Sequence, residues 1–256
     1  MSEEMQKHEY ARLAHREPFY FWNVGRREII EEALLRHIHP SAKLEVLDLG
    51  CGPGDNFQVL EKFGRVTGVD LSEEALKFAR NKGFVNLLLA DVASLPFVGH
   101  SFDIVSSFDV FEHIADDRKA MREAYRVLKP GGFLVITVPA HPWLWSAHDE
   151  ALRHQRRYRT KEFLAKFAQG GFGVLEHSHF VTLAVPVNFL RKVRDQAKKW
   201  IFGGDNNEKK ETYDVVFPPL LNSFLTLVLR IEKSIIRFFS LPFGSSMIVV
   251  ARKPNE

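Results

Sequence analysis

The chain has 256 residues, of which 45% are hydrophobic and 26% charged, and this composition excludes a disordered, collagen-like or coiled-coil protein. Its 35 basic and 32 acidic residues nearly balance, so charge gives no reason to expect nucleic-acid binding. The single cysteine, Cys51, excludes an intrachain disulfide and a metal site built from thiolates alone. The polar first ten residues lack a signal-peptide pattern, and no uncharged run reaches the ~20 residues of a membrane span, so we expect a cytoplasmic protein.

Short apolar runs alternate with helical stretches through the first 140 residues. Five runs, rich in Val, Ile and Leu, are typical of strands buried on both faces of a parallel sheet: Leu44–Leu49, Arg65–Val69, Val85–Ala90, Phe102–Ser106 and Phe133–Val138. Four stretches are predicted as helices: Arg26–Ile38, Asn56–Phe63, Ser72–Lys82 (with Ser72 as its N-cap) and Asp116–Leu128. The sequence Lys129-Pro130-Gly131-Gly132 is predicted to end the last of these helices and turn the chain into the fifth strand.

The C-terminal part adds a helix at Lys161–Gln169 and two further strands, at Val174–Thr182 and Ser246–Arg252. Alternation of strand and helix predicts an α/β fold with a doubly wound, mostly parallel, seven-stranded Rossmann-like sheet. About 60 residues between the last two strands lack this alternation and instead contain apolar stretches and a basic run at Arg191–Lys199. We interpret residues 1–182 and 245–256 as the sheet domain and residues 183–244 as a helical insertion or cap.

A glycine-rich turn follows the first predicted strand, in the order Gly50-Cys51-Gly52-Pro53-Gly54. Such a turn lets a ligand approach the backbone closely, because no Cβ atom blocks it. Asp70 ends the second strand, 20 residues after Gly50, which is the spacing of an acid that hydrogen-bonds ribose hydroxyls. A dinucleotide site needs a third glycine where this chain has Asp55, so the pattern favours a nucleoside without a pyrophosphate.

Five motifs in order resemble the class I S-adenosylmethionine-dependent methyltransferases of the small-molecule type. They are Val46–Gly54, Gly68–Ser72, Leu89–Val92, Phe102–Val105 and Arg126–Gly132. The resemblance implies S-adenosyl-L-methionine as cofactor, S-adenosyl-L-homocysteine as product and no metal.

The resemblance also implies a role for individual residues at the cofactor. Gly50, Cys51 and Gly52 would line its methionine part and ribose, and Asp48 would orient the turn. Its other contacts would come from Asp70 on the ribose hydroxyls, Leu71 on the adenine face, Asp91 on the adenine amine, the Val92 amide on the ring, Phe108 as a packing residue and Arg26 on the carboxylate.

Three histidines follow strands or lie in the loop after the fifth strand, and these are our candidates for taking a proton from the acceptor: His113, His141 and His154. No cluster of acids supports a metal. Arg156 and Arg157, in the same loop, are left as either acceptor-binding residues or surface ion pairs.

The acceptor is predicted to be small and hydrophobic, with methylation at oxygen favoured over nitrogen or carbon. Nucleic acid is disfavoured, because Ser107-Phe108-Asp109-Val110 replaces the tetrad of nucleic-acid amino-methyltransferases. The apolar insertion favours a cap or homodimer interface, or a lipid-like acceptor reached from the inner face of a membrane. A membrane-peripheral lipid or quinone methyltransferase, and a non-catalytic protein that binds S-adenosylmethionine, are the alternatives.

Overall fold

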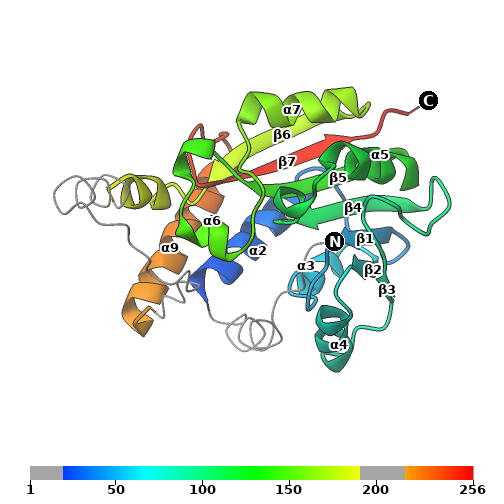
Figure 1. Cartoon of the computed structure of the whole chain (residues 1–256), viewed down its shortest axis with the longest axis horizontal. Coiled ribbons are helices and arrows are strands. Elements are labelled where there is room, and N and C mark those ends of the chain that lie inside the picture. Colours follow the sequence, from blue (N-terminus) through cyan, green and yellow to red (C-terminus); the bar gives the residue numbers. More distant parts are fainter. Residues whose placement is uncertain (1–19, 191–216, 256) are drawn as a thin grey trace.

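The structure is a computed structural model that describes residues 20–190 and 217–255 (Figure 1). Its centre is a seven-stranded sheet with the order β3-β2-β1-β4-β5-β7-β6, in which only β7 runs antiparallel to its neighbours β5 and β6. The strands are β1 (Glu45–Leu49), β2 (Arg65–Asp70), β3 (Leu87–Leu89), β4 (Phe102–Phe108), β5 (Leu128–Pro139), β6 (Gly173–Phe180) and β7 (Ser246–Arg252). The predicted fold class is confirmed.

Helices cover both faces of the sheet (Figure 1). They are α2 (Phe21–Leu35), α3 (Phe57–Leu60), α4 (Glu73–Asn81), α5 (Asp117–Val127), α6 (Ala147–Ala151), α7 (Thr160–Gln169) and α9 (Pro219–Ile236), with short 3-10 helices η1 (Phe111–His113) and η2 (Pro142–Leu144). Apolar residues of α5 and α7 pack on one face, while those of α2, α3, α4 and α9 pack on the other. Successive residues of each central strand point to opposite faces, which explains why these strands are apolar throughout.

Local chemistry fixes where several helices begin. The Ser72 hydroxyl accepts a hydrogen bond from the Ala75 amide at 3.3 Å, which confirms the predicted N-cap of α4. Helix α2 begins at Phe21, five residues before the predicted start, and ends at Leu35. Trp22 in its first turn stacks on Phe180 of β6 at 5.9 Å, so tertiary packing extends the helix beyond its periodic apolar stripe.

The predicted turn at residues 129–132 is instead part of β5, which begins at Leu128. Leu128 pairs with Phe102 of β4, and the register between the two strands then shifts. Gly131 has a φ of 76°, a backbone conformation that suits a glycine at such an irregularity. The glycines therefore form a bulge within the strand rather than a connection before it.

Helix α9 packs directly on α2. A Cβ atom on Gly25 would lie 2.3 Å from Leu229 Cδ1, so the missing side chain is what lets the two helices approach. Glu232 of α9 is buried, and its carboxylate accepts the Val181 amide at 2.6 Å and the Thr182 amide at 2.8 Å just after β6. The basic run 191–199 lies outside the described residues. None of the helices in the described ranges is long and apolar enough to cross a membrane.

Candidate active site

The glycine-rich turn connects β1 to α3, and three of its residues have positive φ values: Gly50 (67°), Gly52 (54°) and Gly54 (79°). At two of these positions the packing leaves no room for a side chain. A Cβ atom would lie 2.6 Å from Val110 at Gly50 and 2.7 Å from Phe84 at Gly54. Gly52 is different, since among the residues 20–190 and 217–255, its own chain neighbours aside, no atom lies within 4 Å of the position its Cβ would take. The backbone at Gly52 therefore borders open space in which a ligand can lie against it.

Asp70, at the end of β2, ties this turn to the next strand. Its Oδ2 accepts the Gly52 amide and its Oδ1 accepts the Ser72 amide, both at 2.8 Å. Burial raises the pKa of Asp70 above its usual value, and the backbone hydrogen bonds oppose that shift. The carboxylate thus stands beside the open space at Gly52, with lone pairs left for further donors.

The Cys51 side chain is buried in the core on the α2 side of the sheet. Its Sγ lies 2.7 Å from the position of a Cβ on Gly68, so the thiol fills the gap left by that glycine under β2. The residue is 4% exposed, and burial raises the pKa of its thiol. Only the Cys51 backbone is therefore available to a ligand at the turn.

Asp48 lies beneath the turn on β1 and is buried. Its Oδ1 accepts the Ser106 hydroxyl at 2.8 Å, whereas its Oδ2 has no hydrogen-bond partner within the described residues. Burial raises the pKa of Asp48 to about 7, although Ser106 and the positive charge of Arg26 both oppose the shift. An unsatisfied buried acceptor at this position favours a ligand or a water that donates a hydrogen bond to it.

Helix α2 brings Arg26 to the same edge of the sheet. The guanidinium forms an ion pair with Asp109, just after β4, and lies 3.4 Å from Asn56 Oδ1. Asp109 also accepts the Thr137 hydroxyl at 3.1 Å. Arg26 is only 8% exposed, so this group of contacts fixes α2 to the carboxyl ends of β4 and β5.

The other residues predicted at the cofactor come from the ends of β2, β3 and β4. Leu71 is 56% exposed and free to cover a planar ring, while Asp91 accepts the Ala93 amide at 2.8 Å. Val92 and Phe108 are buried on opposite faces of the sheet. The structure therefore brings the whole predicted set to one edge, with Phe108 contributing to the core on the α2 side.

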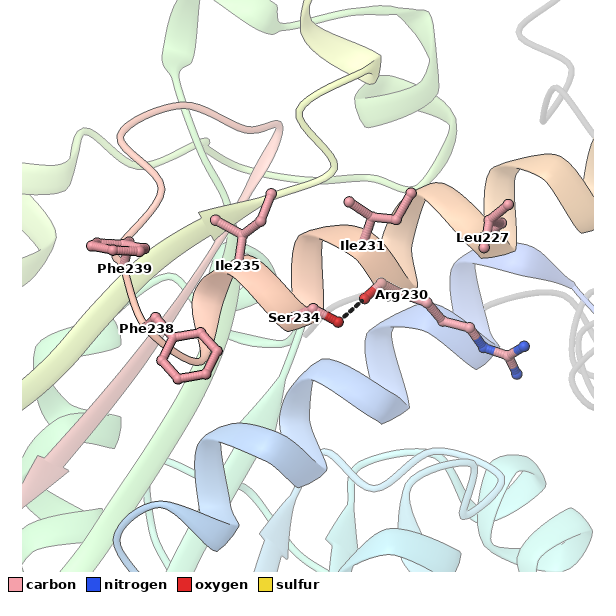
Figure 2. A pocket seen from close by; sticks show the side chains of 7 residues that line it. All are labelled: Leu227, Arg230, Ile231, Ser234, Ile235, Phe238 and Phe239. Carbon is pink, nitrogen blue, oxygen red and sulfur yellow. Dashed lines mark hydrogen bonds between the residues drawn. The ribbon is translucent and has the colours of Figure 1, made fainter.

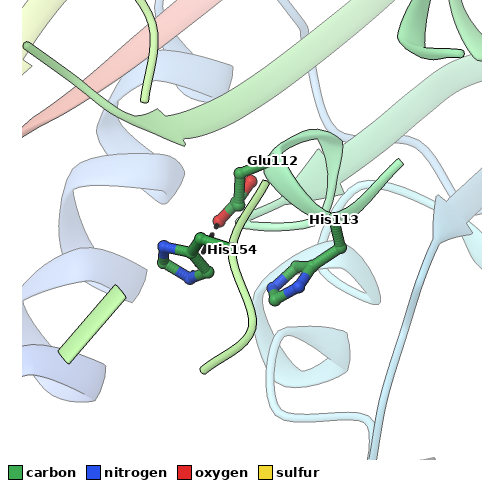
Figure 3. A group of neighbouring side chains, drawn as sticks. All are labelled: Glu112, His113 and His154. Carbon is green, nitrogen blue, oxygen red and sulfur yellow. Dashed lines mark ion pairs between the residues drawn. The ribbon is translucent and has the colours of Figure 1, made fainter. Parts of the chain in front are cut away.

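Two of the three predicted histidines lie together at this edge (Figure 3). The rings of His113, from η1, and His154, from the loop after α6, lie 4.8 Å apart. His154 Nδ1 is 3.0 Å from Asp149 Oδ1, which also accepts the Arg157 Nε–H at 2.7 Å. Glu112 is buried beside them, with its carboxylate 3.9 Å from His154 Nε2.

Burial and neighbouring charges set the protonation of this group. Burial, followed by repulsion from His154, lowers the pKa of His113 to about 4, so its ring is neutral at pH 7. Burial alone would raise the pKa of Asp149, but hydrogen bonds from His154 and Arg157 bring it down to about 2. Asp149 is therefore an anion that orients His154.

His141 lies in a neighbouring group rather than in this one. Its ring stacks on that of His179 at 5.0 Å and on Phe243 at 5.5 Å, and its Nε2 is buried without a hydrogen-bond partner in the described part of the chain. Arg157 links the two groups, because it bonds Asp149 on one side and donates to the Ala140 carbonyl at 3.2 Å on the other.

Sequence reasoning missed Glu112 and Asp149 and left Arg157 open. Arg156 and Arg157 both form ion pairs, with Asp117 at 3.3 Å and with Asp149. The sequence places Asp149 five residues before His154, and this spacing alone does not predict a contact. In the structure, Asp149 lies on α6 and its carboxylate meets the His154 ring.

The fold places the glycine-rich turn and Asp70 at the carboxyl ends of the neighbouring strands β1 and β2, which is where open α/β sheets bind ligands. Residues 47–136 match the family model described as a methyltransferase domain. A malonyl-[acyl-carrier protein] O-methyltransferase of Enterobacter lignolyticus is 32% identical over 163 residues, covering 60% of this chain and 63% of the relative. A chloroplastic 2-methyl-6-phytyl-1,4-hydroquinone methyltransferase of Oryza sativa is 32% identical over 153 residues, covering 57% and 45%.

Among solved structures, a chain from the complex of the Haloferax volcanii Trm112 methyltransferase activator with a methyltransferase has a TM-score of 0.63 at 22% identity, covering 97% of this chain and 96% of that one. This likeness shows the fold. The family match and relatives named as S-adenosylmethionine-dependent methyltransferases support a class I methyltransferase domain at residues 47–136, with S-adenosylmethionine as the cofactor that this family uses. The chain spans 29% to 63% of the length of the curated relatives it matches.

Proposed function

We propose that the protein transfers a methyl group from S-adenosylmethionine to the oxygen of a small hydrophobic acceptor and releases S-adenosylhomocysteine. The observation that carries the proposal is the open space at Gly52, bordered by the Asp70 carboxylate at the junction of β1 and β2. A nucleoside can lie there against bare backbone while its ribose hydroxyls donate to Asp70.

The proposed contacts follow the chain around this edge. The backbone from Gly50 to Gly52 lies against the methionine part and ribose, and Leu71 and Asp91 lie at the adenine. Asp48, with its unpartnered Oδ2, accepts a donor from the cofactor directly or through water. Arg26 holds the amino-acid end once its pairing with Asp109 opens or is shared.

Methyl transfer needs positioning more than it needs activation, because the methyl group on the sulfonium is already electrophilic. A hydroxyl acceptor must also lose its proton. The proposed acceptor place is therefore the edge with His113, His141 and His154, where burial disfavours the charged form of His113 and His141 and leaves neutral imidazoles.

The outer surface of α9 supports a hydrophobic acceptor. A shallow groove of about 430 Å³ runs along it (Figure 2). Its lining is mostly apolar and consists of Leu227, Arg230, Ile231, Ser234, Ile235, Phe238 and Phe239. The apolar members of this lining are 40% to 73% exposed, which is unusual for large apolar side chains and suits a surface that receives a lipid-like molecule.

A transfer assay tests the proposal. The protein is incubated with methyl-tritiated S-adenosylmethionine and a lipid extract of its source cells, and the products are partitioned between organic solvent and water. Label in the organic phase that is lost in Asp70→Ala supports a hydrophobic acceptor. Label confined to water contradicts the acceptor class, and saturable cofactor binding with no labelled product from lipid or whole-cell extract favours a non-catalytic binding protein.

The exposed apolar row on α9 favours a second candidate, in which the enzyme acts while bound peripherally to a membrane. Flotation with anionic liposomes that is lost in the double variant Leu227→Ser and Ile231→Ser supports this mode. Ser234→Ala, in the same groove, is the matched control. Absence of the wild-type protein from the floating fraction contradicts it.

A further inference from the structure

We propose that Glu112, His113 and His154 form a binding site for one divalent first-row metal ion such as Zn²⁺, Mn²⁺ or Co²⁺. The three residues each offer one ligand atom, and these atoms all lie within 4.8 Å of one another (Figure 3). Two come from η1 after β4 and the third from the loop after α6. No sequence spacing predicted this cluster.

The donor set suits such an ion. Imidazole nitrogen and carboxylate oxygen are common ligands of divalent first-row metals, and two histidines with one carboxylate leave coordination positions open for other molecules. Ligand bonds of about 2.1 Å place neighbouring ligand atoms roughly 3–4 Å apart. The side chains therefore need to close by only about 1 Å, within the reach of small rotations about their χ angles.

The surroundings of the Glu112 carboxylate also favour a bound cation. The residue is fully buried, and neither of its carboxylate oxygens has a hydrogen-bond partner among the described residues. An ionised carboxylate that accepts no hydrogen bond in a buried place is costly, and a cation bound between this carboxylate and the two rings offsets that cost.

Both histidines are already oriented as metal ligands usually are. The Nδ1 of His154 lies 3.0 Å from the Asp149 carboxylate, which fixes the tautomer and leaves Nε2 facing Glu112. The His113 ring makes a hydrogen bond with the Arg153 backbone, which leaves its other nitrogen available. A carboxylate or carbonyl behind each ligating imidazole is typical of protein metal sites.

Backbone contacts hold the two halves of the site together without an ion. The Gln155 amide donates to the Glu112 carbonyl at 2.9 Å, and the Gln155 side chain donates to the His113 carbonyl at 2.7 Å. Arg156 adds a hydrogen bond to the Ala115 carbonyl at 3.1 Å. Preorganisation of this kind lowers the entropy that metal binding must overcome.

The charges around the proposed site favour the binding of a cation. Three carboxylates, those of Asp109, Glu112 and Asp149, face two guanidiniums, those of Arg26 and Arg157. These carboxylates and guanidiniums together carry a net charge of −1 when Glu112 is ionised. A divalent ion would convert this charge to +1, next to the place proposed for the acceptor oxygen.

The catalytic use of the ion rests on the proposed methyl transfer. A cation here would polarise the acceptor hydroxyl and lower its pKa. The O–H bond gives up its proton to His141 or to solvent, and the oxygen lone pair forms the new bond to the methyl carbon. The S–CH₃ bond breaks, and its electron pair stays on sulfur as the neutral thioether of S-adenosylhomocysteine.

Cobalt titration of the untagged, chelator-treated protein tests the site. We expect about one equivalent of Co²⁺ to bind with a visible d–d spectrum, and Zn²⁺ to displace it. Glu112→Gln and His154→Ala should abolish this spectrum, and Asp149→Asn should weaken Co²⁺ binding by about 10- to 100-fold. His39→Ala, which removes an exposed histidine outside the cluster, should leave binding unchanged.

Two further measurements separate a failed metal site from a failed cofactor site or a failed fold. The melting temperature of Glu112→Gln without metal should equal or exceed that of the wild type, because the unpartnered charge is gone, while the stabilisation by Co²⁺ should disappear. S-adenosylhomocysteine affinity is measured without metal and tests the proposed function separately. The metal proposal is overturned if the wild type shows no saturable Co²⁺ binding, or if folded Glu112→Gln binds Co²⁺ as the wild type does.

Discussion

Substitution of Asp70 by alanine is the most direct test of the proposed cofactor site. Both oxygens of its carboxylate accept backbone amides, from Gly52 and Ser72, at 2.8 Å. The proposed ribose hydroxyls would use the remaining lone pairs. Hydrogen bonds to a charged acceptor contribute about 1.5–3 kcal/mol, so we expect S-adenosylhomocysteine to bind about 10- to 150-fold more weakly.

The same substitution also removes two acceptors from the folded turn. A loss of about 3 kcal/mol corresponds to a melting temperature lower by roughly 6–12 °C for a chain of this size. Affinity is therefore measured by calorimetry well below the transition, on protein whose fold is verified by circular dichroism. This separates the loss of the ligand contact from the loss of the turn.

Asp55→Ala is the matched control, because Asp55 is an acid of the same segment whose carboxylate pairs with Lys82 at 2.7 Å. We expect its affinity for S-adenosylhomocysteine to equal that of the wild type. A folded Asp70→Ala protein with wild-type affinity would show that the nucleoside does not lie where the structure leaves space at Gly52, and our reasoning would be wrong.

Three further outcomes follow from buried contacts. Burial raises the pKa of Asp48 to about 7, so ionisation of this carboxyl lowers the stability of the fold as pH rises through that value. The Asp48→Asn variant should therefore be more stable than the wild type above pH 7, by up to about 4 kcal/mol. It should lose this advantage near pH 4. Urea unfolding at pH 4 and pH 8 checks this, and an equal difference at both would contradict it. Gly25→Ala should destabilise the protein by about 1–3 kcal/mol through its clash with Leu229, and adding Leu229→Ala should recover part of the loss, whereas additive effects in a double-mutant cycle would count against direct contact. Glu232→Ala should cost about 2–4 kcal/mol and accelerate hydrogen exchange at the two amides that the carboxylate accepts; unchanged exchange there would refute the contact.

The alternation of strands and helices, and hence the fold class, could be predicted because its signals are local. Each central strand is a short apolar run, and the separation of Gly50 and Asp70 follows from one β-α-β unit. The start of α2 could not be predicted, because the packing of Trp22 on Phe180 joins residues that are far apart in the chain. The bulge at Gly131 was mistaken for a turn for a similar reason, since only pairing with β4 reveals it.

The contact between the rings of His113 and His154 was not predicted. His113 and His154 were both candidates because they lie after β4 and in the loop following β5, but nothing in their spacing indicates that their rings meet. Glu112 gave no signal at all, since a glutamate in a polar loop is ordinarily exposed. Its burial depends on the loop around Gln155, whose backbone amide donates to the Glu112 carbonyl. Any residue can supply a backbone carbonyl, so the sequence gives no indication of this contact.

The contact between Gly25 and Leu229 joins α9 to the N-terminal part of α2. Gly25 lies against α9, and the next residue, Arg26, enters the proposed cofactor site. A molecule that displaces α9 from outside must also shift the helical turn that carries Arg26. By reciprocity, a ligand at the proposed cofactor site and a ligand in the groove on α9 would change each other's affinity by the same factor. The packing of α2 on α9 is therefore the physical link through which the two proposed sites would be coupled.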